Sequence, residues 1–290
     1  MIESRGKVVA WAPARRRSRP KWGQLVIGAV TVAVALIVFV PLLWMTLSSF
    51  KSVDETLTPI IRWLPSIWHV DNYTKVFGDN QFGTYFKNSV IVSCSVTLMN
   101  LVVSSLAGYG LAKFSFPGRS LVLLFFLAIL MIPFQVIMIP VYIVVRQFGW
   151  INTYWGLIVP AGVSAFGVFF MRQAISILPD ELFEAARLDG AGELLIYTRI
   201  LLPLCSPSLA ALGVLTFLGS WNNLLWPLLV VQGDTLKTLP LGLAQMATGQ
   251  YGVQYNLLMT GAVISSIPVM AVFLATRSYF VRGIAVGGIK

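Results

Sequence analysis

Six long stretches of this 290-residue chain lack any Asp, Glu, Lys, Arg or His, and the whole chain has only 11 acidic residues. The stretches run roughly over 25–49, 88–112, 121–145, 153–171, 204–231 and 257–276. A bilayer core about 30 Å thick is crossed by ~20 mostly apolar residues in a helix, and each stretch is close to or above that length. Because backbone amides must be paired within lipid, we expect helices. The sequence predicts an all-α, polytopic membrane protein with six transmembrane helices.

Residue types that serve in catalysis or metal binding are scarce as well. His69 is the only histidine, and the two cysteines, Cys94 and Cys205, lie in or beside apolar stretches, so no catalytic residue set and no metal site is predicted. The sequence contains no GxxxxGK[ST] loop, which excludes ATP hydrolysis by that route. Ion-coupled carriers need carboxylates, histidines or basic side chains inside the bilayer, and the six stretches contain none. Uphill transport would therefore draw its energy from another subunit, and no cofactor is expected in this chain.

Interruptions are expected inside the stretches, since proline removes a helical hydrogen bond. The prolines interpreted as kinks or helix ends are Pro133, Pro140, Pro227 and Pro268. The first apolar run is too long for a signal peptide and is not closed by a small-residue cleavage site. It is interpreted as an uncleaved first helix.

The basic residues are distributed unevenly between the segments that join the stretches. Fifteen of the 21 Lys and Arg residues precede the first stretch or lie in 113–119, 172–203 and 277–290. Basic segments stay cytoplasmic, so both termini are predicted to face the cytoplasm, with residues 1–24 as a basic cytoplasmic arm before a membrane domain over 25–290. The charge is spread over short loops, so no nucleic-acid partner is expected.

A cytoplasmic loop at about 179–203 has the pattern of two short helices. Asp180 is predicted to cap the first helix with its carboxylate, because this side chain accepts from the free amides of a first turn. Gly190 is predicted to end that helix, since a positive φ costs glycine little. The second helix is expected over about 193–202, stopped by Pro203.

The first of these helices could meet a partner protein. Ala185 and Ala186 would let a partner approach the backbone closely, and Leu182 and Phe183 would serve as apolar anchors. The alternative is a helix that lies at the lipid headgroups. The residues themselves leave both readings open.

The same loop resembles the EAA loop of ABC-importer permeases, which seats a coupling helix in a groove of the ATPase subunit. The resemblance is carried by Glu184-Ala185-Ala186, then Gly190, then Ile200-Leu201-Leu202-Pro203. The wider pattern resembles the carbohydrate-uptake branch of the family, of the maltose-permease kind, over nearly the whole chain beyond residue 40. Further matching segments include Asp71-Asn72-Tyr73, Phe116-Pro117-Gly118-Arg119, Asn152-Thr153-Tyr154-Trp155-Gly156 and Trp221-Asn222-Asn223. Asn223 departs from the family pattern, in which an acidic residue is expected.

The resemblance implies a type I importer permease fold in a bacterial or archaeal inner membrane, with this chain forming half of the pore. The expected partners are a second homologous permease, two ATPase subunits that bind ATP and Mg²⁺, and an extracytoplasmic substrate-binding protein. The residues expected to couple to the ATPase are Glu184, Ala185, Ala186, Asp189 and Gly190.

Two further sites are expected. Sugars are bound by aromatic faces together with amides and hydroxyls, and Trp221, Asn222 and Asn223 lie midway along the fifth stretch, where they would line the pore. Trp226 is instead assigned to the aromatic belt at the membrane interface. The outside loop at about 232–256 resembles the family's loop that reaches into the binding protein. Its expected contact residues are Gly249, Gln250 and Tyr251.

The sequence therefore predicts the permease subunit of an importer for a sugar or oligosaccharide, without indicating which sugar. A permease for another solute, such as glycerol phosphate, an oligopeptide or an amino acid, would share the EAA loop. The lack of basic residues in the stretches argues against a phosphorylated substrate. A secondary carrier is disfavoured by the neutral stretches, and a membrane enzyme by the missing catalytic set.

Overall fold

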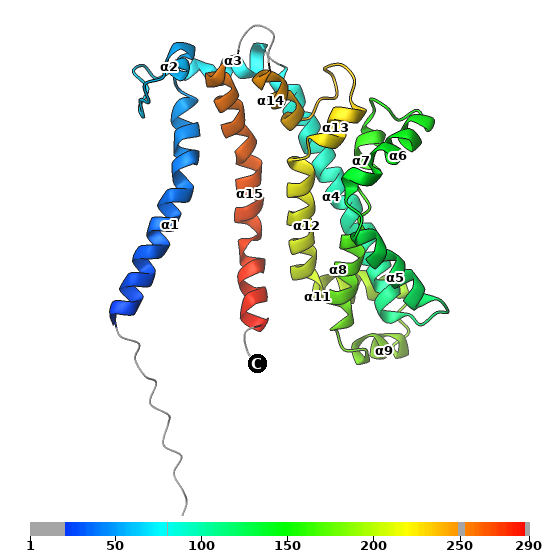
Figure 1. The fold of residues 1–290 in the computed structure, drawn as a ribbon. Helices are drawn as coiled ribbons and strands as arrows, with labels where there is room; N and C mark the ends of the chain where they lie inside the picture. The colour runs from blue at the N-terminus through cyan, green and yellow to red at the C-terminus, as the bar shows by residue number, and fades with distance from the viewer. Residues whose placement is uncertain (1–20, 80, 249–252, 288–290) are drawn as a thin grey trace, which may run out of the picture. The chain divides into compact units, whose positions relative to one another are not determined.

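The computed structural model describes residues 21–79, 81–248 and 253–287, and every regular element within these ranges is a helix (Figure 1). The chain forms two compact units, Met1–Trp44 and Met45–Lys290. Most of the predicted basic arm over 1–24 lies outside the described residues. The prediction of an all-α protein is confirmed.

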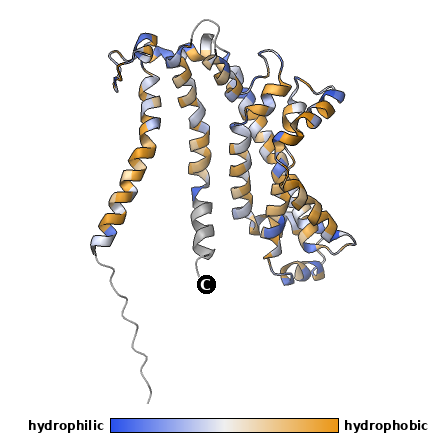
Figure 2. Ribbon diagram, viewed as in Figure 1, coloured by the Kyte–Doolittle hydropathy of each residue, from blue (hydrophilic) through white to orange (hydrophobic). Residues whose placement is uncertain are grey.

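Helix α1 (Lys21–Ser48) begins in the first unit and ends in the second. Its residues 22–40 are exposed on all sides although they are almost entirely apolar. Figure 2 shows hydrophobic residues along most of this helix. A helix that is hydrophobic all round is buried in a large protein core or in a membrane. The first apolar stretch therefore forms the single long helix that was predicted.

Three helices in the described part of the chain are long and apolar enough to cross a membrane: Trp22–Ser48 of α1, α4 (Phe82–Lys113), and Tyr255–Arg277 of α15 (Tyr255–Gly287). Two bent pairs pass the same test when each pair is taken together. One joins α5 (Arg119–Leu130) to α6 (Phe134–Gln147) across a 104° bend. The other joins Glu193–Leu204 to α12 (Ser206–Trp221) across a 78° bend.

The described residues thus contain three continuous candidate spans, or up to five if each bent pair is one span. The predicted fourth stretch, 153–171, is divided between α7 (Tyr154–Ile158) and α8 (Ala165–Ser176). Pro133 directly precedes α6 and confirms the predicted helix end, because its ring leaves no N–H for a continuing helix.

Within the second unit, α8 and α12 both pack along α4, and α15 packs against α12. Glycines allow the close approach of α4 and α8. A Cβ atom at Gly167 would lie 2.3 Å from Ser104 Oγ, and one at Gly108 would lie 2.9 Å from the backbone nitrogen of Arg172. The two helices can pack at this distance only because both positions lack a side chain.

Short helices gather at the two ends of this unit (Figure 1). One end, called the α9 end, holds α9 (Glu181–Leu188), α10 (Glu193–Ile196), a π-helical turn (Tyr197–Leu201) and α11 (Leu202–Leu204). The opposite end, called the α14 end, holds α2 (Val53–Leu57), α3 (Asp71–Asp79), α13 (Leu225–Val230) and α14 (Leu239–Ala247).

Within the second unit, the segments 113–119 and 172–203, both assigned to the cytoplasmic side, meet at one end. At the α9 end, Lys113 forms an ion pair with Asp180. At the α14 end, Asn88 donates to the carbonyl of Lys237 at 2.9 Å, and Asn256 donates to Asn72 at 3.1 Å. The loops on the two predicted sides are therefore separated by the length of the helices.

Candidate functional site

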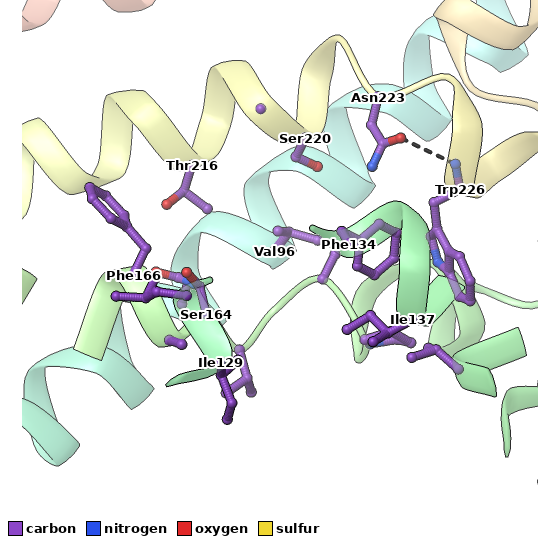
Figure 3. Close-up of a pocket in the computed structure, with 18 of the residues that line it drawn as sticks. Val96, Ile129, Phe134, Ile137, Ser164, Phe166, Thr216, Ser220, Asn223 and Trp226 are labelled. Carbon is purple, nitrogen blue, oxygen red and sulfur yellow. Dashed lines mark hydrogen bonds between the residues drawn. The ribbon is translucent and has the colours of Figure 1, made fainter. Parts of the chain in front are cut away.

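A cavity of about 520 Å³ lies in the second unit where three helical stretches are interrupted (Figure 3). The interruptions are 131–133 between α5 and α6, 159–164 between α7 and α8, and 222–224 between α12 and α13. Each contributes lining residues: Ile132, Pro160, Ala161, Val163, Ser164 and Asn223. Irregular backbone at membrane depth is tolerated where it is buried in protein or lines a cavity that admits water. Helix breaks that line a cavity in this way are therefore compatible with a position inside a membrane.

Hydrogen bonds between side chains and nearby backbone N–H groups stabilise the chain at two of these breaks. Ser164 Oγ accepts from the backbone N–H of Gly167 at 3.1 Å and so caps the start of α8. Asn223 Oδ1 accepts from the backbone N–H of Trp226 at 3.2 Å, in the first turn of α13. The same side chains that end or begin the helices thus also line the cavity.

The part of the lining formed by α12 and the break after it contributes polar groups without charge. Thr216 and Ser220 lie one helical turn apart on α12, and Asn223 lies just beyond the end of that helix; Figure 3 labels all three in the cavity lining. The aromatic rings in the lining are Phe134, Phe166 and Trp226, and the first and last of these meet edge to face with centroids 5.8 Å apart. None of the described lining residues is ionisable. The cavity therefore combines hydroxyl and amide groups with aromatic faces and no charge.

Asn100 of α4 adds a hydrogen-bond donor to this lining. Its side-chain oxygen accepts from Ser104 Oγ at 3.2 Å, whereas its Nδ2 has no partner among the described residues. The residue is fully buried and belongs to the cavity lining. A buried donor without a partner costs free energy, so a group bound beside it would be stabilised.

The three residues predicted to line the pore have different surroundings. Trp221 is buried, and its indole N–H donates to the carbonyl of Ser265 at 3.1 Å in the core between α12 and α15. Asn222 is exposed and donates to the carbonyl of Leu218 at 3.0 Å. Asn223 is the one of the three that lines the cavity.

Trp226 does not belong to an interfacial belt, so that interpretation was wrong. It is 2% exposed, and its indole N–H donates to the carbonyl of Gly156 at 2.9 Å. Sequence reasoning also missed Phe134, Ser164 and Phe166 as lining residues. The available signal was the prolines: Pro133 directly precedes Phe134, and Pro160 lies in the break before α8.

The loop at about 179–203 begins with a different contact from the one predicted. Asp180 makes no side-chain capping bond; its Oδ1 accepts from Lys113 Nζ at 2.5 Å instead. The hydrogen bond and the positive charge of Lys113 lower the pKa of the Asp180 carboxyl. The predicted cap was therefore wrong, because a cation on α4 competes successfully for the carboxylate.

The end of α9 is as predicted. Gly190 has φ +81°, and its N–H and that of Ala191 donate to the carbonyls of Arg187 and Ala186, both at 3.0 Å. The next segment turns into α10 at Glu193 and continues through the π-helical turn to Leu204. The two predicted helical segments are present, but the prediction that Pro203 stops the second one was wrong, because the helix continues to Leu204. Pro203 occupies an early position of α11, where its missing N–H costs little.

The two faces of α9 differ sharply in burial. Phe183 and Ala186 are 1% and 9% exposed and pack into a cluster with Tyr109 and Ile196 of the same chain. The interpretation of Phe183 as an anchor for a partner was therefore wrong. The open face carries Leu182, Glu184, Ala185, Leu188 and Asp189. Of the expected coupling residues, Ala186 faces the core and the others are exposed.

Two remaining predictions can be placed only in part. Gly249, Gln250 and Tyr251 lie outside the described residues. In the described part of the same loop region, Lys237 is 9% exposed and its ammonium group contacts Asp234 and Gln245. Within the described ranges, no three His, Cys, Asp or Glu side chains gather where they could hold a metal ion.

Known proteins have sequences similar to that of this chain. Residues 100–286 match the family described as "Binding-protein-dependent transport system inner membrane component". The chain is 40% identical to the arabinooligosaccharides transport system permease protein AraQ of Halalkalibacterium halodurans, covering 90% of this chain and 95% of that one. It is 33% identical to the lactose transport system permease protein LacG of Rhizobium radiobacter, covering 90% and 94%.

The fold is shared with a solved structure. A chain in the crystal structure of a bacterial ABC transporter involved in the import of the acidic polysaccharide alginate superposes with a TM-score of 0.81. The alignment covers 91% of this chain and 98% of that chain at 22% identity. At this identity the comparison concerns the fold alone.

Proposed function

This chain belongs to the family of binding-protein-dependent transport system inner membrane components, and on that premise we propose that it is the permease subunit of an ATP-driven importer for a sugar or oligosaccharide. Relatives named for arabinooligosaccharide and lactose transport align along about nine-tenths of the chain. The protein is a multi-pass permease of the inner membrane, a transport subunit rather than an enzyme.

The observation that carries the proposal is the neutral cavity at the helix breaks. Sugars present apolar C–H faces and many hydroxyl groups, which suit aromatic rings beside amides and hydroxyls. Phe134 and Trp226 offer the rings, and Thr216, Ser220 and Asn223 offer the polar groups. A phosphorylated solute would be held best by Arg or Lys, and no basic side chain lies in the described lining.

We assign this cavity to one half of a translocation pore, completed by a second, homologous permease. The chain would cross the membrane six times, with α7 and α8 together forming the interrupted fourth span. The α9 end would then face the cytoplasm and the α14 end the outside, since the segments at the α9 end carry the excess of basic residues.

Coupling to ATP would pass through the open face of α9. Glu184, Ala185 and Asp189 are exposed there, and Leu188 is 89% exposed. Closure of two ATPase subunits on ATP would carry α9 with them, and the cavity would change from inward-facing to outward-facing. The loop around 232–256 would meet the binding protein on the other side. Transport then follows from the different affinities of the two states for ATP and for the loaded binding protein.

The test uses the whole complex in liposomes: this chain, its partner permease, the ATPase and the binding protein. We expect ATP-dependent uptake of an arabinooligosaccharide and none of glycerol 3-phosphate. Uptake of the phosphate alone would overturn the assignment to sugars.

Two cavity variants sharpen this test. Thr216→Val and Asn223→Leu remove polar groups with little change in volume, and each should lower initial uptake per assembled complex about tenfold, equivalent to ~1.4 kcal/mol. Thr97→Val on α4 is the matched control, because its hydroxyl donates to the carbonyl of Ser93 and does not line the cavity. Equal uptake by all three variants would remove the cavity from the transport path.

A further inference from the structure

Helix α4 touches the cavity in its middle and loops at both of its ends. Val96 and Asn100 line the cavity. Tyr109 and Lys113 contact the segments around α9, and Asn88 contacts the segment before α14. A single continuous helix therefore joins the loop proposed to meet the ATPase to the loop proposed to meet the binding protein.

Lys113 fastens the beginning of α9 to α4. Its side chain is 4% exposed, and its ammonium group donates to the carbonyl of Leu178 at 2.6 Å and to Asp180 Oδ1 at 2.5 Å. The same group lies 4.9 Å from the ring centroid of Phe183. One buried cation thus contacts two residues just before α9 and one residue in its first turn.

Tyr109 fastens the other end of α9 to the same face of α4, four residues earlier. Its hydroxyl donates to Glu193 Oε2 at 2.6 Å, and Glu193 Oε1 accepts from Arg187 Nε at 2.8 Å. The carboxylate of Glu193 therefore bridges α4 to the last turn of α9. Hydrogen bonds to an ionised group are shorter and stronger than neutral ones.

Two attachments constrain α9 more than one would. A single bond would leave the short helix free to pivot about it, whereas attachments near both ends fix its direction relative to α4. Phe183 fills the space between them, with its ring 6.1 Å from that of Tyr109. The contacts predict that α9 and α4 move as one body.

The opposite end of α4 is fastened as firmly. Asn88 Nδ2 donates to the carbonyls of Thr235 and Lys237, both at 2.9 Å, and Asn88 Oδ1 accepts from the Tyr154 hydroxyl at 2.6 Å. Ser89 Oγ accepts from the backbone N–H of Leu239 at 2.7 Å. The start of the 232–256 loop is therefore held to α4 as well.

We infer that α4 is the rigid element that carries motion of the coupling loop to the cavity and to the outer loop, with Tyr109 and Glu193 as positioning residues that fasten α9 to it. This inference rests on the proposed docking of α9 on the ATPase. It goes further by naming the helix that transmits the motion and the contacts on which transmission depends.

The first test measures rigidity in the assembled complex. Spin labels are placed on the native Cys94, which is exposed on α4, and on Gly192→Cys, where nothing lies within 4 Å of an added Cβ. We expect the distance between the labels to stay constant within about 2 Å between the nucleotide-free and ATP-bound states. A larger change in the parent complex would overturn the inference, whatever the variants do.

The second test removes the contact between Tyr109 and Glu193 that attaches the end of α9 to α4. Tyr109→Phe and Glu193→Ala should retain the ATPase on co-purification, because the open face of α9 is unchanged, yet lower the sugar imported per ATP about tenfold. Glu193→Gln keeps an acceptor for Tyr109 and should recover most of the coupling. Tyr142→Phe on α6 is the control for loss of a tyrosine hydroxyl.

The outcomes separate the two proposals. If the parent complex imports no sugar, the proposed function fails. If the parent imports sugar and Tyr109→Phe behaves like Tyr142→Phe, the inference about α4 fails and the proposed function stands. If Tyr109→Phe does not assemble, the spin-label distance in the parent complex decides.

Discussion

Helix α4 is attached by charged groups at the α9 end and by neutral groups at the α14 end. Lys113 and Glu193 carry the attachment at the first end, and Asp180, the partner of Lys113, is 74% exposed in its side chain. Asn88 and Ser89 carry it at the second end, and both are 2% exposed. Partly exposed ion pairs respond to salt and pH, whereas buried amide bonds do not. The charged attachment thus lies at the end proposed to meet the ATPase, and the neutral, buried attachment lies at the end proposed to meet the binding protein.

The frame at the α14 end extends beyond α4. Asn72 Nδ2 donates to the carbonyls of Ser49 and Lys51 at 2.9 and 3.0 Å, and Asn256 Nδ2 donates to Asn72 Oδ1. Thr260 Oγ1 donates to the carbonyl of Ser49 at 3.0 Å. Buried polar networks of this kind are worth more than their separate bonds, because each bond strengthens its neighbours.

The largest effect is expected at the neutral end. Asn88→Leu would leave the carbonyls of Thr235 and Lys237 and the hydroxyl of Tyr154 without their partner. We expect a loss of roughly 3 kcal/mol in stability, about 1 kcal/mol or more for each group left buried. Thermal unfolding of the purified protein measures it, with the exposed Asn222→Leu as the matched control. Similar midpoints for the two variants would contradict the account of the α14 end.

The next effect concerns the packing of α4 on α8 toward the α9 end. A Cβ atom at Gly108 would meet backbone and Cβ atoms of α8 at 2.9 Å, whereas one at Gly110 would meet nothing within 4 Å. Gly108→Ala should therefore cost about 1–3 kcal/mol through overpacking, and Gly110→Ala should cost little. The yield and unfolding midpoint of the assembled complex distinguish them. An unchanged yield and unfolding midpoint for Gly108→Ala would mean that α4 and α8 can separate.

A smaller effect is expected in the coupling loop. Gly190 has φ +81° and Gly192 has φ −73°. Gly190→Val should cost about 1–2 kcal/mol, since a side chain there enters the left-handed region, whereas Gly192→Val meets no such penalty. The fraction of ATPase that co-purifies measures the effect, because misdirecting α9 weakens docking. Equal retention by the two variants would remove the special role of Gly190.

The features that could be read from the sequence are those that depend on local chemistry or on charge. The helical class, the grouping of loops at two ends and the turn at Gly190 all follow from such rules. The burial of Phe183 did not, because it depends on contacts with α4 and α10. Asp180 was assigned to a cap because the nearest competitor, Lys113, is remote in sequence.

The cavity could not be predicted for a related reason. Its lining combines residues of three helix breaks with residues of α4 and α12, and these segments meet only in the folded chain. Helix α12 is apolar around most of its circumference, so periodicity does not indicate which face turns toward α15 and which toward the cavity. Trp221 and Trp226 are only five residues apart, yet only Trp226 lines the cavity. The sequence had favoured Trp221 for that role.

The smallest effect is the response of the α9 end to acid. The Lys113 ammonium lowers the pKa of Asp180 below its usual value near 3.9. A carboxyl with a lowered pKa stabilises the folded state at every pH above its usual value, and this contribution is lost only as pH falls through the lowered pKa. The parent protein should therefore exceed Asp180→Asn in unfolding midpoint by the same small margin at pH 7.5 and at pH 5. The margin should close only below about pH 4.

Raising the salt concentration at pH 7.5 should shrink the difference in unfolding midpoint between the parent and Asp180→Asn, because the carboxylate is largely exposed. A margin that disappears between pH 7.5 and pH 5 would show that Lys113 does not hold the carboxylate, and the contrast between the charged and neutral ends of α4 would lose one of its two charged contacts.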